Sequence, residues 1–351
     1  MTRAVGYAAQ GAETPLAPFH FERRALRPND VAIDIHYCGV CHSDLHQVRN
    51  DWNNTLYPSL PGHEIVGRVT AVGPEVTRFK VGDMAAVGCM VDSCQQCEPC
   101  KSGLEQYCAK LPTMTYNSKD RQDESLTFGG YSDHIVARDI FVLKMPPGLD
   151  PERAAPLLCA GITTWSPLRR WKIGPGSRVA VAGLGGLGHM GVKLAVGLGA
   201  DVTVVTTSPS KEKDALALGA HRALIAKDRA AMRQAARSFD MVLDTIPVAH
   251  DVQPYLHLLK VHGAHVVVGA IDALPSVHSM LIVGWGRSLA GSLIGGVAET
   301  QELLDFCAAK NILPDTETIA IQSINQAFER MERSDVKYRF VIDMATLKHD
   351  R

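Results

Sequence analysis

The sequence predicts an α/β protein built from an irregular β-rich domain and a doubly wound parallel-sheet domain. The length of 351 residues suits two domains, and an apolar fraction of 46% can supply a core for each. Near residue 150 the pattern changes from short strands broken by glycine and proline to apolar strands that alternate with helices. We expect domains at 1–150 and 151–295, and residues 296–351 returning to the first domain.

Short strands characterise the expected first domain. Residues 31–36 alternate apolar and polar side chains, as a half-buried strand does. Residues 65–72 have the composition of a second strand, which ends at the turn Gly73-Pro74. The many glycines and prolines between such segments favour an irregular β structure.

Strands and helices alternate in the expected second domain. The expected strands are 178–183, 201–206, 239–244 and 264–269, and the expected helices are an apolar segment ending at Gly199, 211–218 and 252–259. Short loops between such elements are typical of right-handed βαβ units and a parallel sheet. A helix near 300–309 and a strand at 338–343 break the alternation, so we assign them to the first domain.

Charge and targeting patterns restrict the classes of function. Lys and Arg number 36 against 37 Asp and Glu, so no net field favours nucleic acid or an anionic membrane. No apolar run reaches the roughly 18–20 residues that span a bilayer, and residues 1–10 lack the pattern of a signal peptide. We expect a cytoplasmic protein that acts on a small molecule, without nucleic-acid or membrane partners.

A glycine-rich loop follows the strand at 178–183 and opens a helix. In a G-x-G-x-x-G loop the first glycine makes the turn, the second admits a pyrophosphate and the third lets helix pack on strand. The helix N-terminus offers the phosphates free N–H groups and a positive dipole. A plain turn is the alternative, but the position favours a Rossmann dinucleotide site that includes Gly183, Gly185, Gly186, Leu187 and Gly188.

The end of the next strand indicates which dinucleotide is bound. An NAD site carries Asp or Glu there to bind the ribose hydroxyls. This chain has no acid at that point, and hydroxyl and ammonium groups suit a 2′-phosphate, so we expect NADP(H). A solvated helical turn is the alternative interpretation of the lysines. The residues concerned are Thr206, Thr207, Ser208, Lys211 and Lys213.

Five of the nine cysteines lie between residues 89 and 108, an odd and clustered pattern that does not suit a disulfide framework. Four thiolates complete a tetrahedral shell, so a metal bound there would be structural. An iron–sulfur cluster can use similar spacing, but the short polar loop suits zinc better. The four expected ligands are Cys94, Cys97, Cys100 and Cys108.

Cys41, His63 and Cys159 form a second, scattered set of candidate ligands. Two thiolates and one imidazole would leave the fourth position of a zinc ion open. Taken singly, each residue is better explained as a buried thiol or a hydrogen-bonded loop histidine. Their spacing does not bring them together.

The chain resembles the zinc-containing medium-chain alcohol dehydrogenases, and within them the cinnamyl-alcohol-dehydrogenase-type branch of NADP-dependent aldehyde reductases. The resemblance covers nearly the whole length. It lies in Gly-His-Glu at 62–64, the four-cysteine lobe, Gly-Gly-Tyr-Ser at 129–132, Cys-Ala-Gly-Ile-Thr at 159–163, the glycine loop, and Tyr-Arg-Phe-Val-Ile-Asp at 338–343.

This resemblance implies a GroES-like catalytic domain beside the Rossmann domain, two zinc ions per chain, NADP(H) and a homodimer. The catalytic zinc would be bound by Cys41, His63 and Cys159, with Glu64 as an alternate ligand and Asp44 supporting the ligands. Ser43 and His46 would relay a proton, although a turn residue and a surface histidine remain the alternatives. His42 and Thr163 would contact the cofactor.

The implied reaction interconverts primary alcohols and aldehydes by hydride transfer. Thr113 stands where lignin-pathway enzymes usually carry Trp, which favours a broad aldehyde reductase over strict cinnamyl specificity. An NAD-linked polyol or secondary-alcohol dehydrogenase of the same fold and a non-catalytic nucleotide-binding zinc protein are the alternatives. Candidate pocket walls, each also explained by ordinary packing, are Trp52, Leu56, Tyr57, Met90, Met114 and Trp285.

Overall fold

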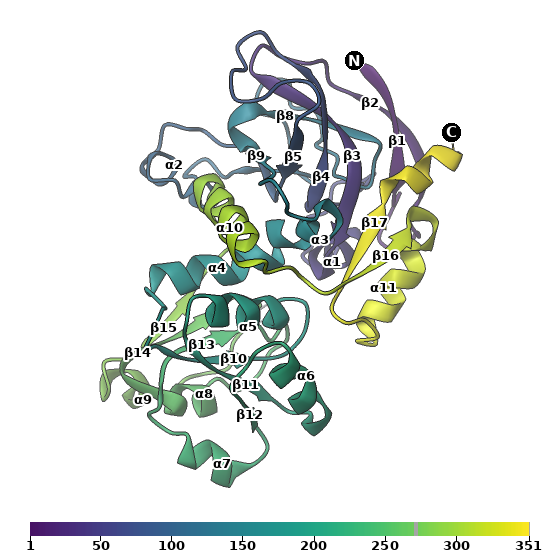
Figure 1. Ribbon diagram of the computed structural model, residues 1–351. Helices are drawn as coiled ribbons and strands as arrows, with labels where there is room; N and C mark the ends of the chain where they lie inside the picture. Colours follow the sequence, from purple (N-terminus) through teal and green to yellow (C-terminus); the bar gives the residue numbers. More distant parts are fainter. Residues whose placement is uncertain (270–272, 351) are drawn as a thin grey trace. The chain divides into compact units, whose positions relative to one another are not determined.

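The computed structural model describes residues 1–269 and 273–350, and the chain divides into two compact units (Figure 1). Unit 1 comprises Met1–Cys159 and Gly296–Arg351, and unit 2 comprises Ala160–Gly295. The C-terminal segment therefore belongs with the N-terminal one. The boundaries expected from the sequence, at residues 150 and 295, stay a prediction.

Unit 1 is built on a seven-stranded, mostly antiparallel sheet. The strand order is β16-β17-β3-β4-β5-β9, and β8 also pairs with β3. β17 lies antiparallel to β3, so the last strand of the chain joins a strand near its start. The strands are β3 (Asp30–Val40), β4 (Ile65–Val72), β5 (Met84–Val87), β8 (His134–Arg138), β9 (Val142–Lys144), β16 (Thr316–Ala320) and β17 (Arg339–Asp343).

Smaller elements complete unit 1. Two ribbons pair antiparallel, β1 (Thr2–Ala8) with β2 (Ala17–Arg23) and β6 (Met90–Asp92) with β7 (Thr113–Met114). The helices are α1 (His42–Val48), α2 (Glu98–Lys101), α3 (Pro151–Ala154), α10 (Val297–Lys310) and α11 (Ile324–Glu332). Single 3₁₀ turns lie at Glu105–Tyr107, Asp139–Phe141, Ala155–Leu158 and Ile321–Ser323, and a longer one at Met344–Asp350.

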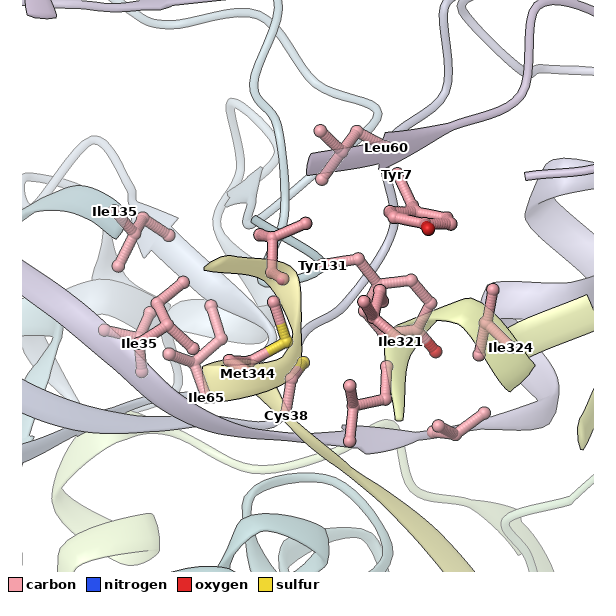
Figure 2. Close-up of a cluster of buried hydrophobic side chains, with 14 of the residues drawn as sticks. Tyr7, Ile35, Cys38, Leu60, Ile65, Tyr131, Ile135, Ile321, Ile324 and Met344 are labelled. Carbon is pink, nitrogen blue, oxygen red and sulfur yellow. The ribbon is translucent and has the colours of Figure 1, made fainter. Parts of the chain in front are cut away.

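The core of unit 1 draws on both ends of the chain. Figure 2 shows buried side chains from the N-terminal strands together with others from the C-terminal segment. Each fully buried side chain of this kind contributes about 1.5–3 kcal/mol, so the C-terminal segment stabilises the whole unit. The labelled members are Tyr7, Ile35, Cys38, Leu60, Ile65, Tyr131, Ile135, Ile321, Ile324 and Met344.

Unit 2 is a doubly wound parallel sheet with the strand order β12-β11-β10-β13-β14-β15. From β10 the chain winds outward to β12 and then returns to β13 on the other side. The loops after β10 and β13 thus diverge, and such a switch point is where open parallel sheets bind ligands. The strands are β10 (Arg178–Ala182), β11 (Asp201–Thr206), β12 (Arg222–Ile225), β13 (Phe239–Asp244), β14 (Leu259–Val267) and β15 (Ser288–Gly291).

The expected strands at 201–206 and 239–244 match β11 and β13. The strand expected at 264–269 instead begins at Leu259, directly after a helix, and ends at Val267. The helices of unit 2 are α4 (Ala160–Arg170), α5 (Gly188–Gly197), α6 (Glu212–Ala217), α7 (Arg229–Gln234), α8 (Gln253–Leu258) and α9 (Met280–Val283), with a 3₁₀ turn at Pro209–Lys211. Within residues 1–269 and 273–350, no helix combines the length and apolar character needed to cross a membrane.

Candidate functional site

Cys41 lies where β3 ends and α1 begins, and it caps that helix. Its Sγ accepts the N–H of Ser43 at 3.5 Å, while the Asp44 carboxylate accepts the N–H of Cys41 at 2.9 Å. This reciprocal arrangement satisfies free N–H groups of the first turn. A sulfur held at a helix N-terminus is also favoured in its thiolate form.

Cys41, His63, Glu64 and Cys159 converge although they are far apart in the sequence. One potential ligand atom from each lies within 4.8 Å of all the others. The two sulfur atoms, of Cys41 and Cys159, are 3.9 Å apart. Two thiolates on one tetrahedral zinc ion are about 3.8 Å apart, given Zn–S bonds of about 2.3 Å. The donor set and its spacing therefore fit a zinc ion.

Asp44 orients the histidine of this set. Its carboxylate is fully buried and lies 2.9 Å from Nδ1 of His63, which leaves Nε2 for a metal. The same carboxylate accepts the N–H of Gly62 at 3.1 Å and the hydroxyl of Tyr131 at 3.2 Å. Because it also accepts the N–H of Cys41, the Asp44 carboxylate links the segment that carries Cys41 to the segment that carries His63.

Glu64 is buried and held by an arginine from the last strand. Its Oε1 accepts a short hydrogen bond from Nη2 of Arg339, which also donates to the carbonyl of Val40 at 2.9 Å. Its Oε2 has no hydrogen-bond partner among the described residues. A Cβ on Gly39 would lie 1.9 Å from that oxygen, so the carboxylate occupies the space that a glycine leaves on β3.

The pKa values of these groups reflect their burial and mutual contacts. The hydrogen bond with Cys159 lowers the pKa of Cys41 well below its ordinary value and raises that of Cys159 well above it. Burial would lower the pKa of His63, but the charge of Asp44 raises it well above the ordinary value. Burial raises the pKa of Glu64 to about 7, against the nearby positive charge of Arg339. A divalent cation bound to the sulfurs of Cys41 and Cys159 would stabilise both of them as thiolates.

Residues 129–131 fix the segment that leads into His63. The N–H groups of Gly129, Gly130 and Tyr131 donate to the carbonyls of Leu60, Gly62 and Pro61 at 2.8, 2.8 and 3.0 Å. A Cβ on Gly129 would lie 2.4 Å from the Pro61 carbonyl oxygen, so only glycine permits this close approach.

Arg23 in turn holds residues 128–134. Its guanidinium is buried and donates to the carbonyls of Phe128, Gly129 and His134 and to the hydroxyl of Ser132. The Gly-Gly-Tyr-Ser motif at 129–132 is thus a backbone brace for the candidate metal site.

Ser43 and His46 lie in α1, directly after the Cys41 cap. Nδ1 of His46 is 2.6 Å from the Asp51 carboxylate, and its ring centroid is 5.9 Å from that of Trp52. The His46 side chain is partly exposed. The ring of His42 lies 6.3 Å from that of His46, and burial lowers the pKa of His42.

The four cysteines of the lobe after β6 also come together. The ligand atoms of Cys94, Cys97, Cys100 and Cys108 all lie within 4.8 Å of one another, and the sulfurs of Cys94 and Cys100 are 3.9 Å apart. This spacing again fits a tetrahedral zinc, here with no open position.

Backbone N–H groups donate hydrogen bonds to sulfur atoms of the four-cysteine lobe. The Cys97 amide donates to the Cys94 sulfur at 3.4 Å, and the Ala109 amide donates to the Cys97 sulfur at 3.4 Å. Hydrogen bonds from the Gln96 and Cys97 amides lower the pKa of Cys94 to about 6, and the bond from the Ala109 amide lowers the pKa of Cys97. Burial instead raises the pKa of Cys100 to about 12. The chain thus stabilises thiolates at part of the set before any metal contributes.

The glycine loop of unit 2 joins β10 to α5, as the sequence predicts. Gly183 has φ +91°, a conformation that side chains rarely adopt, and a Cβ on Gly188 would lie 2.3 Å from the Gly183 carbonyl oxygen. A Cβ on Gly185 would meet nothing within 4 Å, so this position is open to an approaching group. The first glycine makes the turn, the last permits close packing and the middle one leaves access.

The end of β11 lies beside this loop. Nζ of Lys211 donates to the Leu184 carbonyl at 3.1 Å, which places an ammonium group on the glycine loop. Thr206 is buried at the strand end, and its hydroxyl accepts the N–H of Ser208 at 3.2 Å. Thr207 and Lys213 are exposed. Of the expected set, the structure brings Lys211 onto the loop and leaves Lys213 on the outer face of α6.

The remaining candidates are distributed over both units and differ in their exposure. Thr163 is buried in α4. Met90 and Met114 are partners in the β6–β7 ribbon, and Trp52 and Leu56 are exposed. The ring centroid of Trp285 is 5.1 Å from the guanidinium carbon of Arg237 and 5.2 Å from that of Arg287. Tyr57 donates its hydroxyl to the Val48 carbonyl at 2.7 Å, and Thr113 is buried in β7.

Two residues of the site were missed by sequence reasoning. Arg339 lies inside a motif that the sequence singled out, but its partner Glu64 is distant in the chain, and nothing local indicates the pairing. Asp51 follows His46 by little more than one helical turn, and an acid at that spacing could have indicated a partner for the His46 ring.

Family models match two parts of the chain: an alcohol dehydrogenase GroES-like domain at residues 27–147 and a zinc-binding dehydrogenase domain at residues 186–309. NADP-dependent alcohol dehydrogenase C 1 of Mycolicibacterium smegmatis is 50% identical over 99% of this chain and 100% of that protein. Aldehyde reductase YahK of Escherichia coli is 50% identical over 98% and 99%. The structure of a cinnamyl alcohol dehydrogenase from Sorghum bicolor superposes with a TM-score of 0.95 at 43% identity, covering 98% of both chains.

Proposed function

The chain belongs to the zinc-containing medium-chain alcohol dehydrogenases, and on that premise we propose that it reduces a broad range of aldehydes with NADPH, and oxidises the corresponding alcohols with NADP⁺. Proteins that are 50% identical to it include NADP-dependent alcohol dehydrogenases and an aldehyde reductase. The substrates are small molecules, and hydride is transferred between the substrate carbon and the nicotinamide.

The observation that carries the proposal is the convergence of Cys41, His63 and Cys159 in unit 1. Their ligand atoms, with that of Glu64, lie within 4.8 Å of one another, and the sulfur–sulfur distance of 3.9 Å fits a tetrahedral zinc. We assign Cys41, His63 and Cys159 as the catalytic zinc ligands. Glu64, held by Arg339, would be an alternate ligand, because one of its oxygens already lies within 4.8 Å of the other three ligand atoms.

Zinc with an open position supplies Lewis acidity toward a carbonyl oxygen, and NADP(H) supplies or accepts the hydride. The chain's own residues handle the proton. In aldehyde reduction the hydroxyl of Ser43, in the first turn after Cys41, donates a proton to the substrate oxygen and regains one from solvent through His46, which lies one turn further along α1. In alcohol oxidation the proton travels the same route in reverse, with Asp51 holding Nδ1 of His46.

We attribute the proposed preference for NADP(H) over NAD(H) to the residues at the end of β11. Thr206 to Ser208 and Lys211 offer hydroxyl and ammonium donors, and no carboxylate stands between Thr206 and Lys211. The Lys211 ammonium lies on the glycine loop, so a 2′-phosphate bound there would meet a positive charge beside the pyrophosphate. His42 and Thr163 are assigned as further cofactor contacts, and the four-cysteine lobe as a structural zinc site.

Exposed apolar side chains support the proposal of a homodimer. β15 is an edge strand, and large apolar residues in and beside β14, α9 and β15 are strongly exposed: Val261 at 55%, Met280 at 56%, Val283 at 71% and Leu293 at 55%. An unpaired edge with apolar flanks favours association with a second copy. We propose that the enzyme works in the cytoplasm as such a dimer.

An aldehyde panel assayed with NADPH and NADH, with zinc measured on the same sample, tests the function. We expect two zinc ions per chain, turnover of aliphatic and aromatic aldehydes, and a clear preference for NADPH. A preference for NADH would contradict the assignment of the β11 end. One zinc ion per chain without turnover would contradict the enzymatic assignment altogether.

The variant Cys159→Ala should abolish turnover, remove one zinc ion and keep the fold, because it takes one ligand from the open site. Cys307→Ala is the matched control, since Cys307 is buried in α10 and belongs to neither group of candidate ligands. That variant should keep both zinc ions and full turnover. Unchanged activity in Cys159→Ala would remove Cys159 from the ligand set.

A further inference from the structure

A buried carboxylate in unit 2 is shared by two histidines that the proposed chemistry does not use. Asp244 is the last residue of β13 and is fully buried. Its Oδ2 lies 2.8 Å from Nε2 of His250 and 2.9 Å from Nε2 of His265, and its Oδ1 accepts the N–H of Ile246 at 3.1 Å. The cluster therefore ties β13 and β14 to the turn that follows β13.

The hydrogen-bond partners distinguish the two histidines. Nδ1 of His250 lies 2.8 Å from the Val248 carbonyl oxygen, and its Nε2 lies 2.8 Å from the Asp244 carboxylate. Each ring nitrogen of His250 thus has its own partner, one in the turn and one at the end of β13. Nδ1 of His265 has no hydrogen-bond partner among the residues that the structure describes, so His265 donates only to Asp244. His250 thus bridges the turn and the sheet, whereas His265 does not contact the turn.

The same turn packs against the glycine loop. The backbone N–H and the hydroxyl of Thr245 both donate to the Ala182 carbonyl, at 3.0 and 2.8 Å. A Cβ on Gly183 would lie 2.9 Å from the Thr245 hydroxyl, and one on Gly188 would lie 3.1 Å from it. Thr245 therefore fills the space beside the first and last glycines of the loop, and Asp244 is its immediate neighbour in the chain.

We propose that His250, acting through Asp244, positions Thr245 against the glycine loop and thereby sets the affinity of unit 2 for the dinucleotide. This inference rests on the proposed binding of NADP(H) at that loop. His250 is a positioning residue, because it acts through the turn at 245–250. His265 shares the same carboxylate oxygen but stabilises only the β13–β14 pair.

Calorimetric titration of NADPH into the full-length protein tests the proposal, with His250→Leu compared against the matched control His265→Leu. Each variant removes one donor to Asp244, but only the first releases the turn. We expect His250→Leu to weaken NADPH binding about tenfold, and His265→Leu to keep the affinity within about twofold while lowering the melting temperature. His250→Gln, which keeps one donor, should recover part of the affinity.

Equal losses of affinity in the two leucine variants, or an unchanged affinity in His250→Leu, would overturn the proposal. If His250→Leu does not fold, His250→Gln takes its place in the comparison.

The wild-type titration separates this inference from the proposed function. If the wild type binds NADH more tightly, the cofactor assignment fails, and the same variants are compared with NADH, because both dinucleotides place a pyrophosphate on the loop. Amide hydrogen exchange of residues 183–188 without nucleotide gives an independent result. Exchange should accelerate in His250→Leu only, and unchanged exchange there would overturn the inference even if no dinucleotide binds.

Discussion

Gly39 shows how narrowly the carboxylate of Glu64 is placed. A Cβ at this position would lie 1.9 Å from Oε2 of Glu64 and 2.9 Å from its Cδ. The carboxylate is also held by Arg339 on its other side, so it has no direction in which to move easily. The ion pair of Glu64 and Arg339, beside the candidate metal ligands, can therefore be accommodated only because Gly39 has no side chain.

We expect Gly39→Ala to destabilise the protein by about 1–3 kcal/mol and to reduce turnover, because an added methyl group must displace a buried ion pair. Gly11→Ala is the matched control, since a Cβ at Gly11 would meet nothing within 4 Å. Chemical denaturation and the aldehyde assay measure both effects. Equal stability of the two variants would show that the Glu64 side chain relocates without cost.

Asp44 is the residue on which the ligand geometry of His63 depends. We expect Asp44→Asn to lower zinc affinity at the open site by about 10–100-fold, because the amide no longer holds Nδ1 of His63 as a carboxylate does. Zinc at the four-cysteine lobe is the internal control. Dialysis against a graded chelator should therefore remove one zinc ion per chain early and leave the other, whereas loss of both together would contradict this role.

At the scale of elements, the site depends on a segment without regular structure. Residues 129–131 pair with residues 60–62 and thereby set the position of His63, and Arg23 at the end of β2 holds that segment through its carbonyls. Three consecutive backbone contacts leave no room for a Cβ at Gly129. The candidate metal site is thus supported by residues 129–131, which contribute none of its ligands.

We expect Arg23→Leu to destabilise the protein by about 2–4 kcal/mol, because several buried acceptors lose their donor at once. Arg23→Lys should cost less, since an ammonium group can still donate up to three hydrogen bonds. Urea denaturation gives the ranking, and zinc content should decline in the same order. A leucine variant as stable as the lysine variant would show that the carbonyls find other donors.

Local sequence predicts the elements of this protein better than it predicts their partners. The strands β4, β11 and β13 are apolar runs bounded by glycine or turn residues, so their limits are visible in the sequence. The start of β14 is not visible, because Leu259 continues directly from α8 without a turn residue. The pairing of Arg339 with Glu64 depends on β17 meeting β3, which is a contact between distant segments.

The candidate ligands show the same division. The four cysteines of the lobe lie close together in the chain, so their spacing alone predicts a metal site. Cys41, His63 and Cys159 required resemblance to a family, because the sheet and the 3₁₀ turn before Cys159 bring them together. The spacing of these three residues in the sequence does not show that they meet in the folded protein.

At the scale of the whole molecule, the exposed apolar surface around β15 bears on assembly. If the proposed homodimer forms through this surface, Val283→Asp should give a monomer, because a charge in an apolar interface loses its hydration without gaining a partner. Val81→Asp is the control, since Val81 is similarly exposed, at 62%, but lies in unit 1. Sedimentation velocity distinguishes the species, and a dimeric Val283→Asp variant would exclude this surface from the interface.

The return of the chain to its first unit has a consequence for synthesis on the ribosome. Residues 160–295 form a continuous unit that can fold as soon as they emerge, whereas the N-terminal segment must wait for β17 to fill its place beside β3. Until then Glu64 lacks the guanidinium of Arg339, and two clusters of thiols sit in an unfinished nascent polypeptide. Chaperones that shield the emerging N-terminal half would therefore matter more to the yield of active enzyme than those that act on the middle.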